Sequence, residues 1–314
     1  MAPPKHFSLS IEQLHAEAIA ATGLKDFGDD SYRPALQVLL DSYDASAELG
    51  DLGRYSVWAM LLNCLRGRLL AQQGIKENKD NLQAEISKPL FIVGLPRTGT
   101  TILHRLLAAD PRNQALEYWL SSFPQPRPPR AEWEQNPRYQ EVEHSLQMLD
   151  QIAPEMKQIH EMTAAGADEC RMLLMQSFVN VTFQANAGVA DYEQWLYHAD
   201  LGPAYALYRD CLRLIGCNDP DRRWVLKDPS HLWAMDTLLE TFPDATIIQT
   251  HRNPVQLIPS VSSLVLTARR MQEPSVEAAV VGAGELAQWS RVLNKTLQVR
   301  RSQPDRFIDV YYED

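Results

Sequence analysis

A loop between a predicted strand and a predicted helix carries the residues best suited to binding phosphate. The apolar run at 89–93 ends at Gly94, and the sequence GLPRTGTT, from Gly94 to Thr101, leads into a helical pattern at 100–109. Backbone N–H groups in such a turn point inward, and the dipole of the following helix adds positive potential. The residues that we expect to contact the anion are Pro96, Arg97, Thr98, Gly99, Thr100 and Thr101.

The loop lacks the lysine with which the P-loop of a nucleotide kinase binds a triphosphate. A kinase P-loop reads G-x-x-x-x-G-K-[ST], whereas here Thr100 follows the second glycine and Arg97 supplies the positive charge. The strand expected at Thr246–His251 is followed by Arg252 rather than by a carboxylate that could hold Mg²⁺. We therefore expect a phosphate site without a metal. A P-loop kinase acting on a small molecule is the alternative.

Arg252 and Ser260 form a second candidate anion site. Arg252 follows a predicted strand, and Ser260 lies eight residues later in the helix predicted at 254–270, about two turns along it. The arginine offers a planar fork for phosphate, and the serine offers a hydroxyl group. A lone arginine at a strand end is more often a surface ion-pair partner. Arg252 and Ser260 therefore indicate an anion site only in combination with the first loop. Together the two sites suit a ligand with phosphate at both ends.

Alternating strands and helices in the second part of the chain favour a parallel sheet. The expected strands are 89–94, 224–227, 246–251 and 307–312, and the expected helices are 100–109, 231–241, 254–270 and 274–301. This alternation predicts an α/β fold with a P-loop NTPase-like parallel sheet flanked by helices. Residues 1–87 are interpreted as an N-terminal helical segment packing on the core at 88–314, which contains a helical insertion at about 120–220.

Composition and charge limit the class of protein and its partners. The net charge of the 314 residues is −10 and no long basic run occurs, so nucleic acid is not expected. The four cysteines lack a spacing that suits a metal. No apolar run approaches the roughly 20 residues of a membrane-spanning helix. We expect a cytoplasmic protein that binds no metal and has no stable membrane insertion.

The two anion sites resemble those of the PAPS-dependent sulfotransferases (PAPS is 3'-phosphoadenosine-5'-phosphosulfate). The loop is similar to that of a bacterial branch that reads P-R-[ST]-G-T-T, and the resemblance covers most of the chain. It implies that Gly94–Thr101 binds the 5'-phosphosulfate and that Arg252 and Ser260 bind the 3'-phosphate. It also implies that Lys227, in the sequence LKDP, lies near the transferring sulfate. The implied activity is transfer of the sulfuryl group from PAPS to a small-molecule hydroxyl by in-line displacement, releasing PAP.

Two features depart from the pattern of that family. The cytosolic eukaryotic enzymes carry their base in Lys-Thr-His, whereas the sequence from Lys227 to His231 is KDPSH, which displaces the histidine by two residues. Family members usually continue past the position of Asp314 through further helices and a Gly-rich, basic segment that binds the 3'-phosphate. We expect that segment to be missing. A catalytically inactive, nucleotide-binding protein of the same fold is therefore the second alternative.

Three side chains are candidates for the general base. His231 is the first choice, because it lies just past a strand end, where ligands bind in open α/β sheets. Glu169 is the second, since many sulfotransferases use a glutamate, and His160 is the third. Each also has an interpretation without a catalytic role. His231 would be a polar residue at a helix start, Glu169 a carboxylate on a helix face, and His160 a structural histidine. Arg97 and Lys227 are expected to neutralise charge on the leaving oxygen.

Aromatic residues are candidates to line an apolar acceptor pocket, although such residues more often belong to the core. They are Trp119, Tyr192, Trp195 and Tyr197. The partner that we expect is a small-molecule hydroxyl acceptor. A homodimer is an alternative to a monomer.

Overall fold

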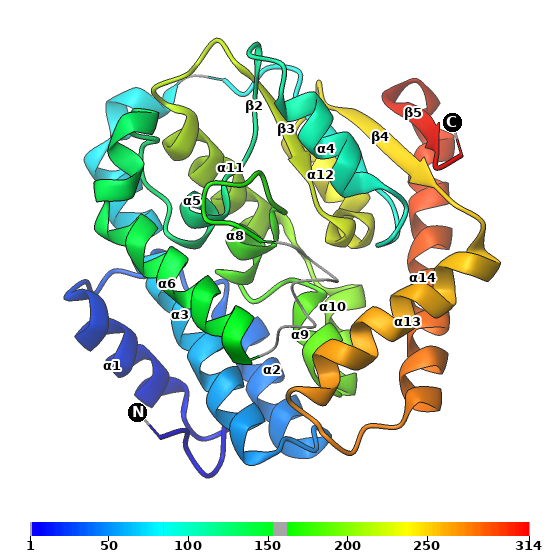
Figure 1. Ribbon diagram of the computed structural model, residues 1–314. Helices are drawn as coiled ribbons and strands as arrows, with labels where there is room; N and C mark the ends of the chain where they lie inside the picture. Colours follow the sequence, from blue (N-terminus) through cyan, green and yellow to red (C-terminus); the bar gives the residue numbers. More distant parts are fainter. Residues whose placement is uncertain (1, 84, 153–161, 314) are drawn as a thin grey trace.

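The structure is a computed structural model that describes residues 2–83, 85–152 and 162–313. Within these residues, five parallel strands form one sheet in the order β2-β3-β1-β4-β5 (Figure 1). The strands are β1 (Leu90–Val93), β2 (Asn113–Gln114), β3 (Arg223–Lys227), β4 (Thr246–His251) and β5 (Phe307–Tyr311). The parallel α/β fold predicted from the sequence is therefore confirmed.

Helices precede the sheet, fill the connection between β2 and β3, and alternate with the later strands (Figure 1). Those before β1 are α1 (Ile11–Thr22), α2 (Arg33–Ala45) and α3 (Asp51–Glu77). Those between β1 and β3 are α4 (Thr100–Ala108), α5 (Tyr118–Ser122), α6 (Pro137–Ile152), α8 (Arg171–Met175), α9 (Thr182–Asn186), α10 (Ala190–His198) and α11 (Gly202–Gly216). After β3 come α12 (Met235–Thr241), α13 (Pro254–Arg270) and α14 (Ala278–Ser302).

The register of β1 brings three strand ends to one edge of the sheet. Phe91 lies between Leu226 of β3 and Ile247 of β4, and Ile92 is paired with Lys227. Because the strands run parallel, the segments that leave β1, β3 and β4 begin side by side. This edge is where open α/β sheets bind their ligands.

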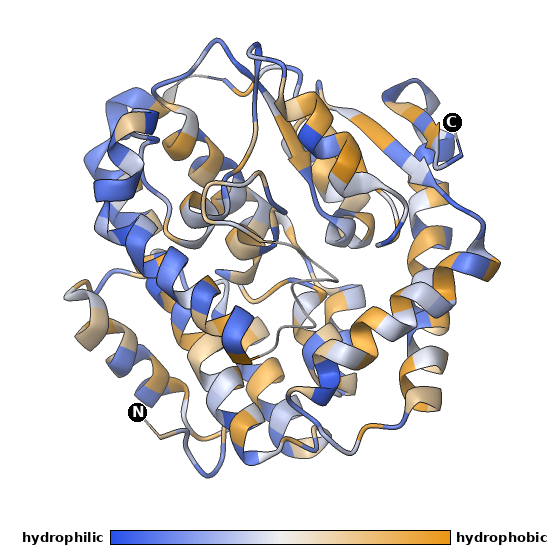
Figure 2. Cartoon of the chain, viewed as in Figure 1, coloured by the Kyte–Doolittle hydropathy of each residue, from blue (hydrophilic) through white to orange (hydrophobic). Residues whose placement is uncertain are grey.

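The two faces of the sheet are covered by different parts of the chain. Phe91, Leu226 and Ile247 belong to a large apolar cluster that also contains residues of the N-terminal helices. The alternate residues of the same strands, Ile92 and Val225, pack in a small cluster beneath α4, as expected for strands whose side chains alternate between faces. Figure 2 shows apolar residues concentrated along β3 and β4, whereas α6 is mostly hydrophilic.

The N-terminal helices share this core with the sheet. The large cluster includes Phe7, near the start of the chain, and Phe307 of β5. The division of the chain into segments 1–87 and 88–314 stays a prediction. Across the described residues, no helix has both the length and the apolar character that crossing a membrane would require.

The segment after β3 differs in detail from its sequence prediction. The helix predicted at 231–241 begins instead as a 3-10 helix, η3 (Pro229–Ala234), followed by α12. The side chain of Asp228 accepts a hydrogen bond from the N–H of Ser230 and so caps η3. Pro229 suits this first position because its missing N–H is not needed there.

Arg68 of α3 connects the N-terminal segment to the helical insertion. Its guanidinium is buried and donates to the carbonyl oxygens of Phe27 (2.6 Å) and Asp29 (3.0 Å) and to the hydroxyl of Ser177 (3.3 Å). It also lies 4.1 Å from the ring centroid of Tyr32. One side chain therefore satisfies backbone groups that local structure leaves unpaired.

We predict that Arg68→Ala lowers the free energy of unfolding by about 2–4 kcal/mol, because it leaves buried carbonyl groups without donors. Urea unfolding measures the change. Arg112→Ala is the matched control: Arg112 is exposed and pairs only with Asp110 among the residues described, so its change should stay within about 0.5 kcal/mol. Equal effects of the two substitutions would contradict this role of Arg68.

Candidate active site

The loop after β1 turns through two residues in the left-handed backbone region. Arg97 has a φ of 74° and Gly99 a φ of 85°. Thr98 lies between them with a buried hydroxyl, which contacts the carbonyl oxygen of Leu95 at 2.7 Å and the hydroxyl of Thr250 at 2.6 Å. The loop is thus anchored to β4, and Arg97 is left exposed at the tip.

Gly94 begins this loop at a point where no side chain fits. Its φ is 152°, and an added Cβ would lie 2.2 Å from the hydroxyl oxygen of Thr250. The same hydroxyl contacts the carbonyl oxygen of Val93 at 3.3 Å. Glycine is required here so that the loop can pass close to the end of β4.

The start of α4 presents unused backbone donors. Gly99 is the N-cap residue, and no side chain caps the helix. The N–H groups of Thr98, Gly99 and Thr100 donate to no acceptor among the described residues. Unpaired donors at a helix start, together with the helix dipole, form an anion site.

The second predicted anion site lies against the first. One guanidinium nitrogen of Arg252 donates to the carbonyl oxygen of Arg97 at 3.0 Å, and Nε of Arg97 lies 3.3 Å from the hydroxyl oxygen of Ser260. The guanidinium of Arg252 also lies 4.3 Å from the ring centroid of Tyr312. Nε of Arg252 is buried without a partner among the described residues. The two sites are therefore one continuous surface rather than two separate ones.

Lys227 and Glu169 form an ion pair beside this surface. Nζ of Lys227 lies 2.7 Å from a carboxylate oxygen of Glu169, and only 1% of Lys227 is exposed. Lys227 is paired in the sheet with Ile92, close to the start of the loop. The N–H of Cys170 donates to the carbonyl oxygen of Lys227 at 3.0 Å, so the segment that carries Glu169 is attached to the end of β3.

His104 and Asp228, which were not predicted as site residues, also lie close to Lys227. His104 bonds the carbonyl oxygen of Val225 at 3.0 Å. Burial lowers the pKa of His104 to about 4, and the charge of Lys227 adds to this effect. Asp228 is buried directly after Lys227. The sequence indicates either residue only through its position. His104 lies on the helix that follows the loop, and Asp228 directly follows Lys227.

The structure disfavours His231, the first choice for the base. The residue is fully buried, and its ring packs edge-on against Phe91 with centroids 5.3 Å apart. Its Nδ1 lies 2.7 Å from the hydroxyl oxygen of Tyr205, and burial lowers its pKa to about 3. A side chain enclosed in this way cannot contact an acceptor unless the core opens. His160, the third choice, lies outside the described residues.

The aromatic residues proposed for an acceptor pocket occupy different environments. Trp119 and Tyr192 are fully buried, and the hydroxyl of Tyr192 donates to the carbonyl oxygen of Phe178 at 2.8 Å. These two therefore belong to the core. Tyr197 is partly exposed and lies 4.2 Å beneath the guanidinium of Arg291, measured to the ring centroid.

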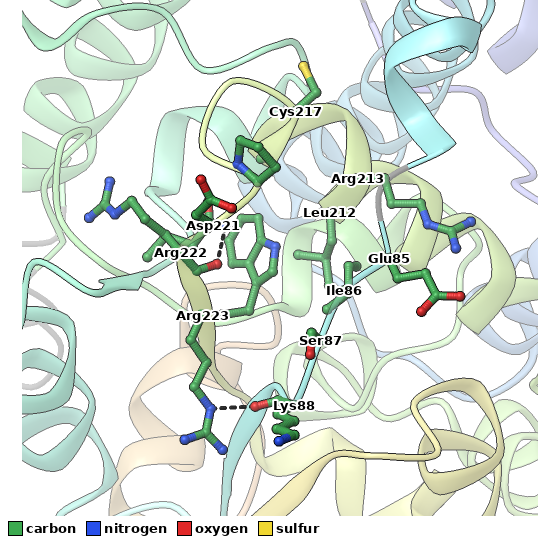
Figure 3. Close-up of a pocket in the computed structure, with 14 residues that line it drawn as sticks. Glu85, Ile86, Ser87, Lys88, Leu212, Arg213, Cys217, Asp221, Arg222 and Arg223 are labelled. Carbon is green, nitrogen blue, oxygen red and sulfur yellow. Dashed lines mark hydrogen bonds between the residues drawn. The ribbon is translucent and has the colours of Figure 1, made fainter.

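A pocket of about 270 Å³ lies at the opposite end of the strands, where β3 begins and just before β1 (Figure 3). Lys88, Arg213, Arg222 and Arg223 contribute to its lining, and Arg223 donates to the carbonyl oxygen of Lys88. Ligands of open α/β sheets bind at the carboxyl ends of the strands. This pocket therefore lies outside the candidate active site.

The parallel sheet and the helices that cover it define an α/β protein with a P-loop-like fold. The sequence model of the sulfotransferase family matches residues 89–314, from just before β1 onward. The chain therefore belongs to the sulfotransferase family, as its resemblance predicted. No curated protein matches the sequence.

Two solved structures of mycobacterial sulfotransferases are similar to the chain. Sulfotransferase STF1 from Mycobacterium tuberculosis H37Rv is 40% identical with a TM-score of 0.93, and the match covers 99% of this chain and 86% of that one. Sulfotransferase STF9 from Mycobacterium avium is 26% identical with a TM-score of 0.87, covering 96% of this chain and 78% of that one. Because both matches span nearly all of this chain, the similarity includes the helices before β1.

We predict that Gly94→Ala lowers the free energy of unfolding by about 1–3 kcal/mol, because the new methyl group collides with Thr250 and the backbone is strained. Gly284→Ala in α14 is the control, since nothing lies within 4 Å of its added Cβ. That change should stabilise the chain by about 0.5–1 kcal/mol. Unfolding in urea compares the two, and a neutral Gly94→Ala would show that the close approach is not needed.

Proposed function

We propose that this chain transfers the sulfuryl group of PAPS to the hydroxyl group of a small-molecule acceptor and releases PAP. The observation that carries the proposal is the contact between the two anion sites, in which Arg252 donates to Arg97 and Arg97 contacts Ser260. A donor with phosphate on both ends of a nucleoside needs two adjacent sites of this kind. Membership of the sulfotransferase family supports PAPS as that donor.

The reaction would be an in-line displacement at sulfur. A bond forms between the acceptor oxygen and sulfur, while the bond between sulfur and the 5'-phosphate oxygen breaks. The loop N–H groups and Arg97 would bind the 5'-phosphosulfate and stabilise charge on the leaving oxygen, with Lys227 beside them. Arg252 and Ser260 would bind the 3'-phosphate, for which a planar guanidinium is well suited.

Glu169 is the residue that we propose as general base. It accepts a hydrogen bond from Lys227 at 2.7 Å and is partly exposed, whereas His231 is enclosed in the core. An ionised carboxylate at this position can take the proton of the acceptor hydroxyl as the new bond forms. The same lysine that contacts the base would then also lie beside the transferring sulfate.

We predict that PAP raises the melting temperature of the chain without any metal, because it binds the folded state alone. A PAP concentration of about 100 times Kd should add about 2.7 kcal/mol to the free energy of unfolding. Arg252→Ala should remove most of this shift, whereas Arg270→Ala, an exposed arginine at the far end of α13, should leave it unchanged. Stabilisation by ATP with Mg²⁺, and none by PAP, would favour a kinase instead.

We predict that transfer from labelled PAPS, screened across alcohols, phenols, sterols and glycans, depends on Glu169. Glu169→Gln should lower kcat by about 10²–10⁴-fold, the usual contribution of a general base, and should not weaken PAP binding, because it removes a negative charge beside Lys227. His231→Gln should reduce stability but keep kcat within about tenfold of the parent once the folded fraction is equalised. The opposite ranking of these two variants would restore His231 as the base. PAP binding without transfer to any acceptor would favour an inactive protein.

A further inference from the structure

Five ionisable side chains gather at the carboxyl end of β3, and we call them the β3-end cluster. They are Asp168, Glu169, Arg171, Lys227 and Asp228. By definition the cluster holds two cations and three carboxyl groups, so it carries one negative charge if every member is ionised. A buried carboxylate oxygen that lacks a hydrogen-bond partner is costly, so a carboxyl group in such a position favours its protonated form.

The geometry of Asp228 identifies it as that group. Only 1% of the residue is exposed. One carboxyl oxygen accepts from the N–H of Ser230 at 2.8 Å and also from the hydroxyl of Ser230. The other oxygen, Oδ2, is buried without a hydrogen-bond partner among the described residues. An ionised carboxylate with a bare buried oxygen is unfavourable, whereas a protonated carboxyl group carries no charge there.

The surroundings of Asp228 favour the protonated form near neutral pH. Burial raises the pKa of Asp228 to about 7, the charge of Glu169 raises it as well, and the bonds from Ser230 and the charge of Lys227 oppose these effects. Other titratable groups of the described residues that lie near it are uncharged in this range: Cys170, Tyr205 and Tyr208, whose pKa values burial raises, and His231, whose pKa burial lowers to about 3. Within the part of the chain that the structure describes, the charges that act on Asp228 include those of Glu169, Lys227 and Arg171.

We propose that Asp228 is a positioning residue that carries the proton of the β3-end cluster and so makes the binding of the anionic donor depend on pH. When Asp228 is protonated, Lys227 pairs with Glu169 and Asp228 adds no negative charge near the bound anion. When it loses its proton to solvent, a second carboxylate competes for Lys227 and opposes the anion. This inference rests on the proposed function for the identity of the donor. The state of Asp228 itself can be tested without any ligand.

The first experiment uses the free chain and follows its melting temperature against pH. In the unfolded chain an aspartate ionises near pH 4 (about 3.9), whereas the folded chain keeps Asp228 protonated up to about pH 7. The folded state binds more protons in this window, so this group makes stability fall as pH rises through it. The melting temperature of the parent should therefore fall relative to that of Asp228→Asn over this window. A difference between the two that does not change with pH would overturn the inference.

Asp200→Asn is the matched control for this comparison. Asp200 also accepts a backbone hydrogen bond near a helix start, from the N–H of Gly202 at 2.9 Å, but it is exposed. The difference in melting temperature between Asp200→Asn and the parent should therefore not change with pH. Ser230→Ala removes the hydroxyl hydrogen bond that lowers the pKa of Asp228 and keeps the bond from the backbone N–H, so the fall in stability should extend to higher pH.

The second experiment measures the Kd of PAP against pH by calorimetry. The phosphates of PAP titrate identically for every variant, so the comparison isolates the protein. If bound PAP raises the pKa of Asp228 by about one unit, the parent loses about tenfold in affinity relative to Asp228→Asn as pH rises past neutrality. Asp200→Asn should follow the parent. An identical pH dependence for the parent and Asp228→Asn would overturn the coupling. Absence of PAP binding at every pH would instead refute the proposed function, while the first experiment still decides the state of Asp228.

Discussion

The hydrogen bond from Arg252 to the carbonyl oxygen of Arg97 joins the loops that follow two neighbouring strands, β4 and β1. It can form only because these strands are parallel and paired, so that both loops leave the same edge of the sheet. The hydroxyls of Thr98 and Thr250 add a second link between the same two strands. Gly94 makes this close approach possible. The anion surface is thus a consequence of sheet topology.

Elements with strong apolar patterns were predictable from the sequence. The strand predicted at Thr246–His251 and the helix predicted at 254–270 have the bounds observed for β4 and α13, because buried strands and amphipathic helices display their periods directly. β2 was not predicted, since two polar residues show no alternation. Asn113 and Gln114 form a strand only because they pair with Arg223 and Trp224 of β3. Such a strand is defined by its neighbour and not by its own residues.

The candidate site was predictable where its residues are contiguous and not where they meet through the fold. The loop from Gly94 to Thr101 contains its own turn and helix start, so its residue types indicate an anion site locally. The ion pair of Lys227 with Glu169 joins residues 58 positions apart, and no local pattern pairs them. His231 looked accessible in the sequence because it follows a strand end, but Tyr205 packs over it from α11. Burial of this kind depends on long-range packing.

A crystal structure of the chain with bound PAP would show whether the two loops form one surface for a doubly phosphorylated nucleotide. We expect one phosphate group on the N–H groups of Thr98, Gly99 and Thr100, and the other on Arg252 and Ser260. Both contacts should form with the fold of the sheet unchanged. PAP bound instead in the pocket beside Arg222 and Arg223, at the other end of the strands, would contradict this expectation.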